Sequence, residues 1–404
     1  MPESTWQEIR RRFVLSRRFS DFSYMALGPV PVSTASAIEA ASRALDDGAL
    51  EYADAHNPHK SKLVFEAVSE YFEIAESLIA HTHSTTMGLA QLYGGIVMRP
   101  GQEILTSQNE HFTTLEALRL RRLRDGTPFR QIPLFADSRK ISTAEILKNL
   151  ERGIRPETRV LALTWVYSSD GVKLPMSEIA ALVRHCNKTR SIAARILFVI
   201  DGVHGFGVED VTFDRLGCDL FAAGCHKWIF GPRGTAILCG TEEAWHQVVS
   251  IVPSFSDPAS GIARQFQPGG IQALENIWAM ADAFRFIMSI GKKQIQERVH
   301  DLATQLKDGI RTMSHVDLRT PLSSDHSSGI VCFDVTGKTA ADVVDCLMAK
   351  HRVKATESGI DSAVGHTHAR LSPGILNTPH EVDAAIRAVG SMAPPAFPPS
   401  GPVP

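Results

Sequence analysis

The sequence predicts an α/β fold in which helices cover both faces of a mainly parallel sheet, followed by a smaller C-terminal α+β domain. Two apolar runs, residues 160–166 and 196–200, are typical of strands buried on both faces. Residues 176–187, between them, have the apolar spacing of a helix. Because parallel strands are joined through such crossover helices, this strand–helix–strand alternation indicates a parallel sheet.

The other elements follow the same criteria along the chain. Helices are expected at residues 4–19, from near Thr34, at 62–80, from Ser84 through Leu92, and at 113–124, 143–151, 340–351 and 381–389. Strands are expected at 103–106, 129–133, 221–223, 236–238 and 329–335, with a linker at 253–268 and a long helical stretch at 271–313.

These elements suggest four parts. We expect an N-terminal arm at 1–32, a large domain at 33–265, a small C-terminal domain at 266–392 and a disordered proline-rich tail at 393–404.

Composition favours small-molecule chemistry. Lys and Arg total 42 against 44 Asp and Glu, which leaves a formal charge of −2 and no basic field for nucleic acid. The six cysteines lack paired spacing, as expected of reduced thiols, and no apolar run approaches the roughly 20 residues of a membrane span. The arginines at 10–12 and 17–18 are interpreted as a solvated helix face, and contact with a partner is the less favoured alternative. We therefore expect a cytoplasmic enzyme with no nucleic-acid or membrane partner.

A lysine and an aspartate suggest the cofactor. Lys227 lies in the segment 223–228, and Asp201 ends the apolar run 196–200. A lysine can form a Schiff base with the aldehyde of pyridoxal 5'-phosphate (PLP), and a carboxylate can keep the pyridine nitrogen protonated. The alternatives are a solvated lysine and an aspartate that caps a loop, but the apolar residues 228–230 favour a buried lysine.

Two further segments suit the ends of such a complex. The hydroxyls of residues 84–86 lie where a loop enters a helix, a place that suits a phosphate, although such residues also cap ordinary helices. Arg370 could bind the carboxylate of an amino acid through two parallel donors, although a structural ion pair is the alternative.

Taken together, these motifs resemble the class V aminotransferase family of fold type I PLP enzymes, in particular its isopenicillin N epimerase-like branch. The resemblance extends from about residue 20 to residue 390, and its most specific pieces are residues 84–89, 163–175, 201–204 and 225–228, with Arg370. It implies that the large domain binds PLP and that the chain forms a homodimer with sites at the interface.

The resemblance also implies roles for individual residues. Lys227 would form the Schiff base and shuttle the proton, Asp201 would pair with the pyridinium, and His204 would act near the phenolic oxygen. His111 would stack on the ring, with Phe112 as a second candidate. Arg370 would bind the substrate carboxylate, and Ser168 would lie beside the cofactor. The phosphate would be held by four residues, Ser84, Thr85, Thr86 and His226.

The chain departs from the family pattern at three places. Gly224 replaces a residue that commonly contacts the phosphate, and Gly269-Gly270 stands where Gly-Thr often reaches the partner's phosphate. No cysteine lies between Lys354 and Arg370, so persulfide-forming desulfuration is not expected.

Two His-X-His sets, at residues 81–83 and 366–368, raise the alternative of a metal site. No Cys-X-X-Cys or His-Glu-X-X-His motif accompanies them, so we expect no metal. His366 or His368 is a candidate substrate contact because both closely precede Arg370.

The predicted function is a PLP enzyme that acts through a Schiff base and a quinonoid at the α-carbon of an amino acid or an amino-acid-derived metabolite. An epimerase-like or lyase- or cyclase-like outcome is expected ahead of transamination. A non-catalytic, ligand-binding homologue is the alternative from another class. The substrate and the fate of the quinonoid stay open, because the protein chooses among outcomes by placing acids in three dimensions.

Overall fold

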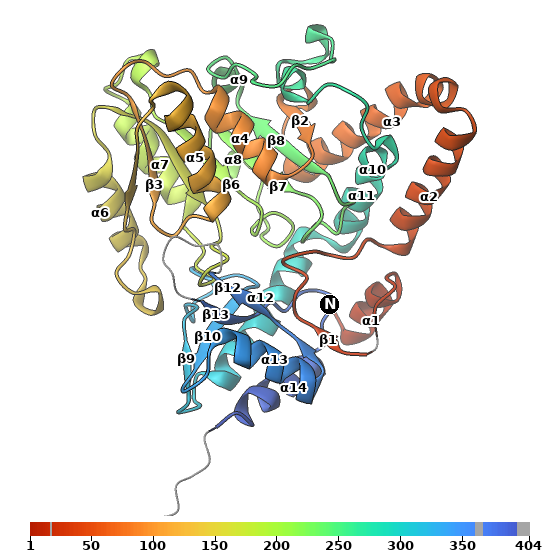
Figure 1. The fold of residues 1–404 in the computed structure, drawn as a ribbon, viewed down its shortest axis with the longest axis vertical. Helices are drawn as coiled ribbons and strands as arrows, with labels where there is room; N and C mark the ends of the chain where they lie inside the picture. Colours follow the sequence, from red (N-terminus) through yellow and green to blue (C-terminus); the bar gives the residue numbers. More distant parts are fainter. Residues whose placement is uncertain (17, 360–366, 394–404) are drawn as a thin grey trace, which may run out of the picture.

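The computed structural model describes residues 1–16, 18–359 and 367–393, and its centre is a seven-stranded sheet (Figure 1). The strands, in spatial order, are β2 (Ile79–Thr82), β8 (Ala236–Gly240), β7 (Leu220–Gly224), β6 (Leu197–Asp201), β5 (Thr158–Thr164), β3 (Glu103–Ser107) and β4 (Phe129–Ile132). Only β8 runs against the other strands of this sheet. The α/β fold with a mainly parallel sheet is therefore confirmed.

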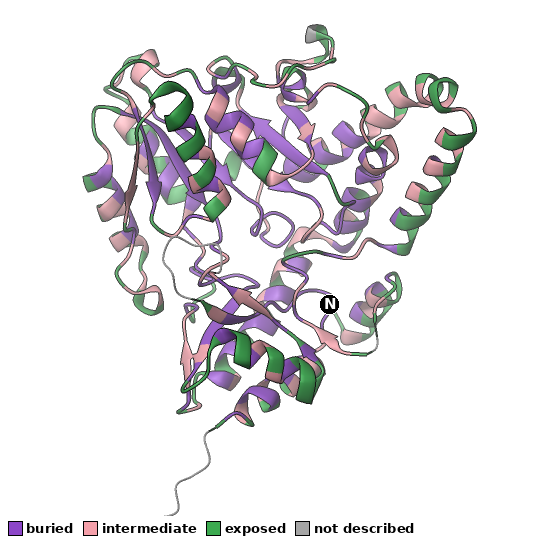
Figure 2. Cartoon of the chain, in the orientation of Figure 1, coloured by how far each residue is buried: buried purple, intermediate pink, exposed green. Residues whose placement is uncertain are grey.

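Both faces of the sheet are buried, because its side chains alternate between two hydrophobic cores. In β5, Leu161 and Leu163 point into one core, and Val160 and Ala162 into the other. The first core is covered by α3 (Ala49–Phe72), α6 (Thr143–Gly153), α7 (Met176–Asn187) and α11 (Met280–Ile290). The second is covered by α4 (Thr85–Gly95), α5 (Phe112–Asp125) and α9 (Glu242–Trp245). Figure 2 shows the central strands buried and the outer helix faces exposed, and the edge strand β4 is only partly buried.

The C-terminal part has its own antiparallel sheet in the order β12 (Thr356–Ser358), β13 (His368–Leu371), β10 (Val331–Val335) and β9 (Val316–Leu318). It packs against α12 (Lys292–Ile310), α13 (Ala340–His351) and α14 (Pro379–Gly390). Along α12, Val299 belongs to the core of the large sheet and Leu302 to the core of the small one. The domain boundaries drawn from the sequence stay predictions.

The N-terminal arm differs from the expected helix at 4–19. Helix α1 (Glu3–Arg11) ends early, and the chain then forms β1 (Ser20–Asp21), which pairs with β11 (Val353–Lys354). Arg10 donates two hydrogen bonds to Glu381 of α14, at 2.6 and 3.1 Å. The arm is thereby attached to the C-terminal part before it enters α2 (Val32–Asp47).

Two other predicted stretches differ from the structure. The helix expected to end at residue 80 ends at Phe72, because Glu73 is left-handed (φ 53°) and β2 follows. The stretch at 271–313 is three helices, α10 (Leu274–Trp278), α11 and α12, interrupted at Gly291 (φ 97°). The predicted tail, apart from Ala393, lies outside the described residues. In the described ranges, none of the helices combines the length and apolarity that a membrane crossing requires.

Candidate active site

The predicted site residues meet at the carboxyl ends of the large sheet's parallel strands, where ligands bind in open α/β folds. They follow β2 (Ser84, Thr85, Thr86), β3 (His111), β5 (Ser168), β6 (Asp201, His204) and β7 (His226, Lys227). Two cavities of about 200 and 230 Å³ lie here and share His111, Ser168, His204 and Lys227 on their walls. We call the first the inner cavity, lined also by residues 84–86 and Asp201, and the second the outer cavity, lined also by Arg370.

The inner cavity begins at the N-terminus of α4. Ser84 caps this helix by accepting the amide of Met87 at 3.1 Å. The amides at a helix N-terminus and the hydroxyls of residues 84–86 together form a cradle that favours an anion.

Gly224 leaves room for this cradle. Its amide donates to Thr85 Oγ1 at 2.8 Å, which leaves the proton of that hydroxyl available to a ligand. A Cβ at position 224 would lie 2.9 Å from His226 Cε1 and 3.1 Å from Thr85 Oγ1. The backbone amide at position 224 therefore orients the Thr85 hydroxyl, and a side chain there would crowd both Thr85 and His226.

His226 completes the cradle. Its Nδ1 is buried and has no hydrogen-bond partner in the described part of the chain, although it lines the inner cavity. A buried polar atom without a partner is costly, and a phosphate oxygen would supply the missing contact. The residues present thus fit the phosphate of PLP.

Asp201 and Lys227 provide the charges of the inner cavity. Burial raises the pKa of Asp201 to about 6. Two contacts oppose this shift, the charge of the nearby Lys227 and the amide of Val203, which donates to Oδ1 at 3.1 Å. Burial lowers the pKa of Lys227 to about 8, with Asp201 opposing and Arg370 reinforcing this shift. A lysine with this pKa has a substantial neutral, nucleophilic fraction close to physiological pH.

His204 is held as a neutral imidazole. Burial first, and then the charge of Lys227, place its pKa well below the ordinary value. Its Nδ1 accepts the indole N–H of Trp228 at 3.4 Å, so its proton resides on Nε2, which lies 3.5 Å from Lys227 Nζ. His204 thus presents a hydrogen-bond donor to the cavity.

The two stacking candidates differ in position. His111 lines both cavities, and its Nδ1 lies 2.8 Å from Thr113 Oγ1. Phe112 is 43 % exposed and is absent from both walls. The geometry favours His111.

Arg370 reaches the outer cavity from β13. Its Nη1 donates to the carbonyl of Ser168 at 2.7 Å, and its Nε donates to Thr356 Oγ1 at 2.9 Å. The guanidinium is thus oriented from both the large and the small part of the molecule.

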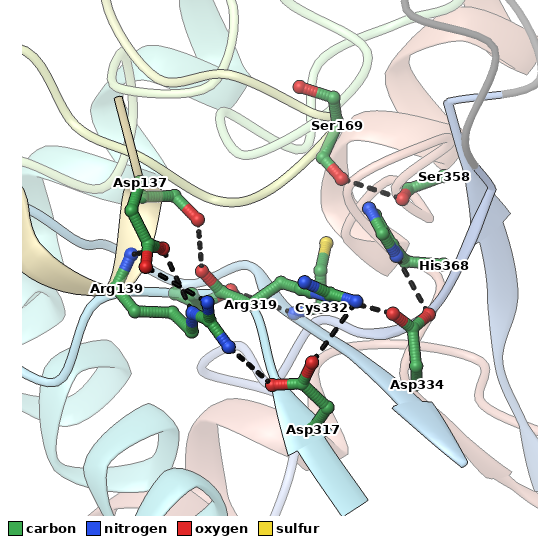
Figure 3. Close-up of polar contacts among 11 residues, drawn as sticks. Asp137, Arg139, Ser169, Asp317, Arg319, Cys332, Asp334, Ser358 and His368 are labelled. Atoms are coloured by element: carbon green, nitrogen blue, oxygen red, sulfur yellow. Dashed lines mark hydrogen bonds and ion pairs between the residues drawn. The ribbon is translucent and has the colours of Figure 1, made fainter. Parts of the chain in front are cut away.

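His368 lies on the same strand as Arg370, but its Nδ1 contacts Asp334 Oδ1 at 2.7 Å and its side chain is absent from both cavity walls (Figure 3). His366 lies outside the described residues. The substrate contact suggested for these two histidines is therefore a prediction that the geometry does not support for His368.

The other His-X-His set, at residues 81–83, has its first histidine buried against an aromatic ring. His81 stacks on Phe65 at 6.0 Å, and burial together with the charge of Arg264 lowers its pKa to about 4. Over the described ranges, no group of three His, Cys, Asp or Glu side chains is arranged to hold a metal ion.

Several cavity residues were missed from the sequence. Glu110, Thr164 and Tyr167 lie on the cavity walls, and Met25 and Ala26 of the arm cover the outer cavity. Glu110 directly precedes His111 after a buried strand, which is a usable signal. The arm carries no such signal in its sequence. It reaches the site because the amide of Gly28 donates to the carbonyl of His226 at 2.8 Å, a contact made only in the folded chain.

A family comparison extends over most of the chain. The model described as Aminotransferase class-V matches residues 54–388. Isopenicillin N epimerase from Streptomyces clavuligerus is 23% identical over 411 residues, which cover 97% of this chain and 99% of the relative. A probable cysteine desulfurase from Halalkalibacterium halodurans is 23% identical, over 77% of this chain and 76% of the relative.

Solved structures share the fold. A complex of the cystine C–S lyase C-DES with cysteine persulfide has a TM-score of 0.82 at 20% identity, over 94% of this chain and 99% of that chain. A C-DES mutant with glycine covalently linked to its PLP cofactor has a TM-score of 0.83 at 20% identity, over 95% and 99% of the two chains. The predicted fold type I architecture is confirmed.

Proposed function

Because the chain belongs to the aminotransferase class-V family, whose members are PLP-dependent enzymes, we propose that its two joined cavities hold PLP and an amino-acid substrate. The observation that carries this proposal is the placing of Lys227 between the phosphate cradle with Asp201 on one side and Arg370 on the other. The chain thus offers a nucleophile, an anion and a carboxylate clamp in one connected space.

When bound, PLP supplies an aldehyde that condenses with amines and a ring that accepts electrons from the α-carbon. Ser84, Thr85, Thr86 and His226 bind the phosphate in this proposal, as donors in the cradle. Asp201 keeps the ring nitrogen protonated through a charge-assisted hydrogen bond. His111 packs against the ring, while Ser168 and His204 provide polar contacts at its edge.

Lys227 would have two tasks, which are to hold the cofactor through its aldehyde and to move the proton of the substrate α-carbon. Its depressed pKa suits both, because a base is most effective when its pKa lies near the working pH. Arg370 orients the substrate by its carboxylate, which fixes the α-proton relative to Lys227.

We propose a lyase-like outcome at the α-carbon first. Elimination needs one base on one side of the substrate, and Lys227 supplies it. The epimerase of similar length favours epimerisation as the second candidate, and transamination ranks third.

A persulfide on an enzyme cysteine is not proposed. The sequence has no cysteine after Cys346. Cys332, which pairs with Arg370 across β10 and β13, is buried, and burial raises the pKa of its thiol to about 12. Such a thiol does not supply a nucleophilic thiolate at neutral pH.

The test begins with the cofactor. The purified chain is expected to bind one PLP per site and to show an absorbance band near the visible edge that borohydride abolishes. Lys227→Ala should lose both that band and activity, because no other amine replaces the nucleophile; retention of both would contradict the proposal.

Screening amino acids for spectral shifts, then determining the mass and chirality of products, separates elimination from epimerisation. A chain that takes up no PLP would support the non-catalytic alternative.

The assembly proposed is a homodimer in the cytoplasm. Ile271, Phe255 and Val249 carry exposed apolar side chains in the segment around Gly269-Gly270, as a contact with a second copy requires. All six cysteines are unpaired, in keeping with a reducing compartment. Cell fractionation tests the location, and sedimentation tests the assembly.

A further inference from the structure

Glu110 has no role in the function proposed above, although it lies against the site. Its side chain is 0 % exposed and forms part of the outer cavity wall. The inference below deepens the proposed function and rests on it for the part that concerns the cofactor.

The carboxyl of Glu110 is surrounded by hydroxyls. Ser107 Oγ lies 2.8 Å from its Oε1, and Thr164 Oγ1 lies 2.5 Å from its Oε2. The amide of Thr164 also donates to Oε1 at 3.3 Å. Glu110 is thus connected to the end of β5.

The proton of Ser107 can be assigned. Its oxygen accepts the amide of Asn109 at 3.2 Å and the hydroxyl of Tyr167 at 2.7 Å, which uses both lone pairs. Its own proton therefore goes to Glu110 Oε1. Between Glu110 Oε2 and Thr164 Oγ1, in contrast, the proton can belong to either oxygen.

Glu110 shares the outer cavity wall with the cations Lys227 and Arg370, but the charge that acts on its pKa is that of the anionic Asp201. Asp201 on β6, Tyr167 after β5 and Tyr93 on α4 face it, and the ring of the adjacent His111 is engaged with Thr113. Within the described ranges, no lysine, arginine or histidine forms an ion pair with Glu110. A buried carboxylate without an ion-pair partner is costly, so the protonated form of Glu110 is favoured.

The pKa of Glu110 agrees with this reading. Burial raises it to about 7, opposed by the hydrogen bonds from Thr164 and Ser107 and reinforced by Asp201. Both protonation states are thus accessible near neutral pH.

We propose that Glu110 is a positioning residue that holds an exchangeable proton behind the cofactor site and so sets the orientation of the Thr164 hydroxyl. When protonated, Glu110 donates to Thr164 Oγ1, and the proton of Thr164 turns away toward the inner cavity, of which Thr164 forms a wall. When Glu110 releases its proton to solvent, Thr164 donates to Oε2 and presents lone pairs to the cavity. One O–H bond breaks and no other bond changes.

This orientation reaches the proposed partner of the ring nitrogen. Thr164 pairs in register with Asp201 across β5 and β6, and both line the inner cavity. A hydroxyl that changes from donor to acceptor beside Asp201 alters how strongly Asp201 attracts a proton. The visible band of the bound cofactor should therefore carry a titration that belongs to Glu110.

Three variants separate this role from simple packing. Glu110→Gln mimics the protonated state permanently, since its amide can donate to Thr164 and its oxygen can accept from Ser107. Thr164→Val removes the hydroxyl that transmits the proton's position. Glu116→Gln on α5 is the matched control, because Glu116 is an exposed carboxylate that pairs with Arg119.

The first measurement needs no cofactor. Infrared difference spectra of the unliganded chain should show a protonated-carboxyl band that disappears with a midpoint near pH 7. The component with a midpoint near pH 7 should be absent in Glu110→Gln and retained in Glu116→Gln and Thr164→Val, whereas the carboxyl of Asp201, with its pKa of about 6, contributes a separate component at lower pH in all of them. An unchanged band in Glu110→Gln would overturn the assignment of the proton, whether or not PLP binds.

The second measurement uses the PLP-loaded protein. Glu110→Gln and Thr164→Val should each remove a one-proton step near pH 7 from the pH dependence of the visible band, and Glu110→Gln should keep Kd for PLP within about 3-fold of wild type. Glu110→Ala should raise that Kd at least about 10-fold, because it leaves buried hydroxyls without partners. An unchanged pH dependence in Glu110→Gln would overturn the coupling. Failure of the wild type to bind PLP would overturn the proposed function instead, since the infrared titration stands apart from it.

Discussion

At the scale of single residues, Lys227 depends on two neighbours of opposite charge. Asp201 favours the protonated ammonium, whereas burial and Arg370 favour the neutral amine. Burial is the largest contribution, and it lowers the pKa of the Lys227 amine to about 8 from the ordinary value of lysine. The site can therefore prepare its nucleophile without a separate base.

Uptake of PLP by the cofactor-free chain should follow this pKa. Lowering of the folded-state pKa to about 8 means that the neutral amine is lost as pH falls through 8 and fully present above it. We expect the rate of band formation to rise with a midpoint near pH 8. Asp201→Asn should move the midpoint down and Arg370→Ala up, each by about one unit, because they remove charges of opposite sign. Arg233→Ala, at an exposed position, should leave it unchanged. Shifts in the reverse directions would refute this account of Lys227.

At the scale of elements, the arm is the least expected contributor to the site. Its residues Met25 and Ala26 cover the outer cavity, and Gly28 crosses directly over Lys227. A Cβ at Gly28 would lie 2.4 Å from the Lys227 carbonyl oxygen, a backbone atom that cannot rotate away. The glycine is thus required by close approach of two backbones.

Substitution of Gly28 tests this packing. Gly28→Ala should break the hydrogen bond from its amide to the His226 carbonyl and destabilise the chain by about 1–3 kcal/mol, the usual range for overpacking a filled space. It should also weaken PLP binding, because Lys227 shifts with its backbone. Urea unfolding and PLP titration measure the two effects. Leu27→Ala, at the neighbouring half-exposed side chain, is the control; equal effects of both substitutions would argue against the close approach.

Which elements could be predicted depends on how local their causes are. The helices at 176–187 and 340–351 have the predicted bounds, since apolar spacing and chain-local end signals define them. Strands β1, β11 and β12 have two or three residues, and tertiary pairing creates them. Lys227 and Asp201 could be proposed from the sequence because Asp201 ends one buried strand and Lys227 follows another. Glu110 could not be assigned a role, since its hydroxyl partners come from two different strands.

At the scale of the whole molecule, one loop joins the small sheet to the site. The carbonyls of three consecutive residues after β5 accept hydrogen bonds from the C-terminal part: Ser168 from Arg370, Ser169 from Ser358 Oγ, and Asp170 from Thr320 Oγ1, all at 2.7 Å. The nearby ion pairs of Arg139 and Arg319, drawn in Figure 3, are partly exposed and contribute little individually. The loop is therefore expected to set the position of Arg370.

Removal of the two side-chain donors should loosen the carboxylate clamp. The double variant Thr320→Val with Ser358→Ala loses two hydrogen bonds worth about 1 kcal/mol each, so the apparent Kd for an amino acid should rise roughly 10- to 30-fold. Kd for PLP should stay unchanged, because the phosphate cradle belongs to the large sheet. Spectral titration of the loaded protein measures both. Arg139→Ala should leave both constants near wild type. A loss of PLP in the double variant would show that the hydrogen bonds to this loop support the whole site instead of Arg370 alone.

The exposed segment at residues 249–271 leads to a prediction about assembly. Ile271 is fully exposed and Phe255 is 81 % exposed. Both lie near Gly269-Gly270, the position at which the family resemblance implies a contact with the phosphate bound by the partner subunit. Two large apolar side chains in water are unfavourable unless a second surface covers them.

The wild-type chain should therefore sediment as a homodimer at micromolar concentration. The double variant Phe255→Asp with Ile271→Asp should weaken the dimer at least about 100-fold, because charges would be buried in its contact. Val14→Asp alters an equally exposed apolar residue on the arm and should leave the dimer intact. A wild-type monomer would refute the homodimer, whereas an undiminished dimer in the double variant would place the contact elsewhere.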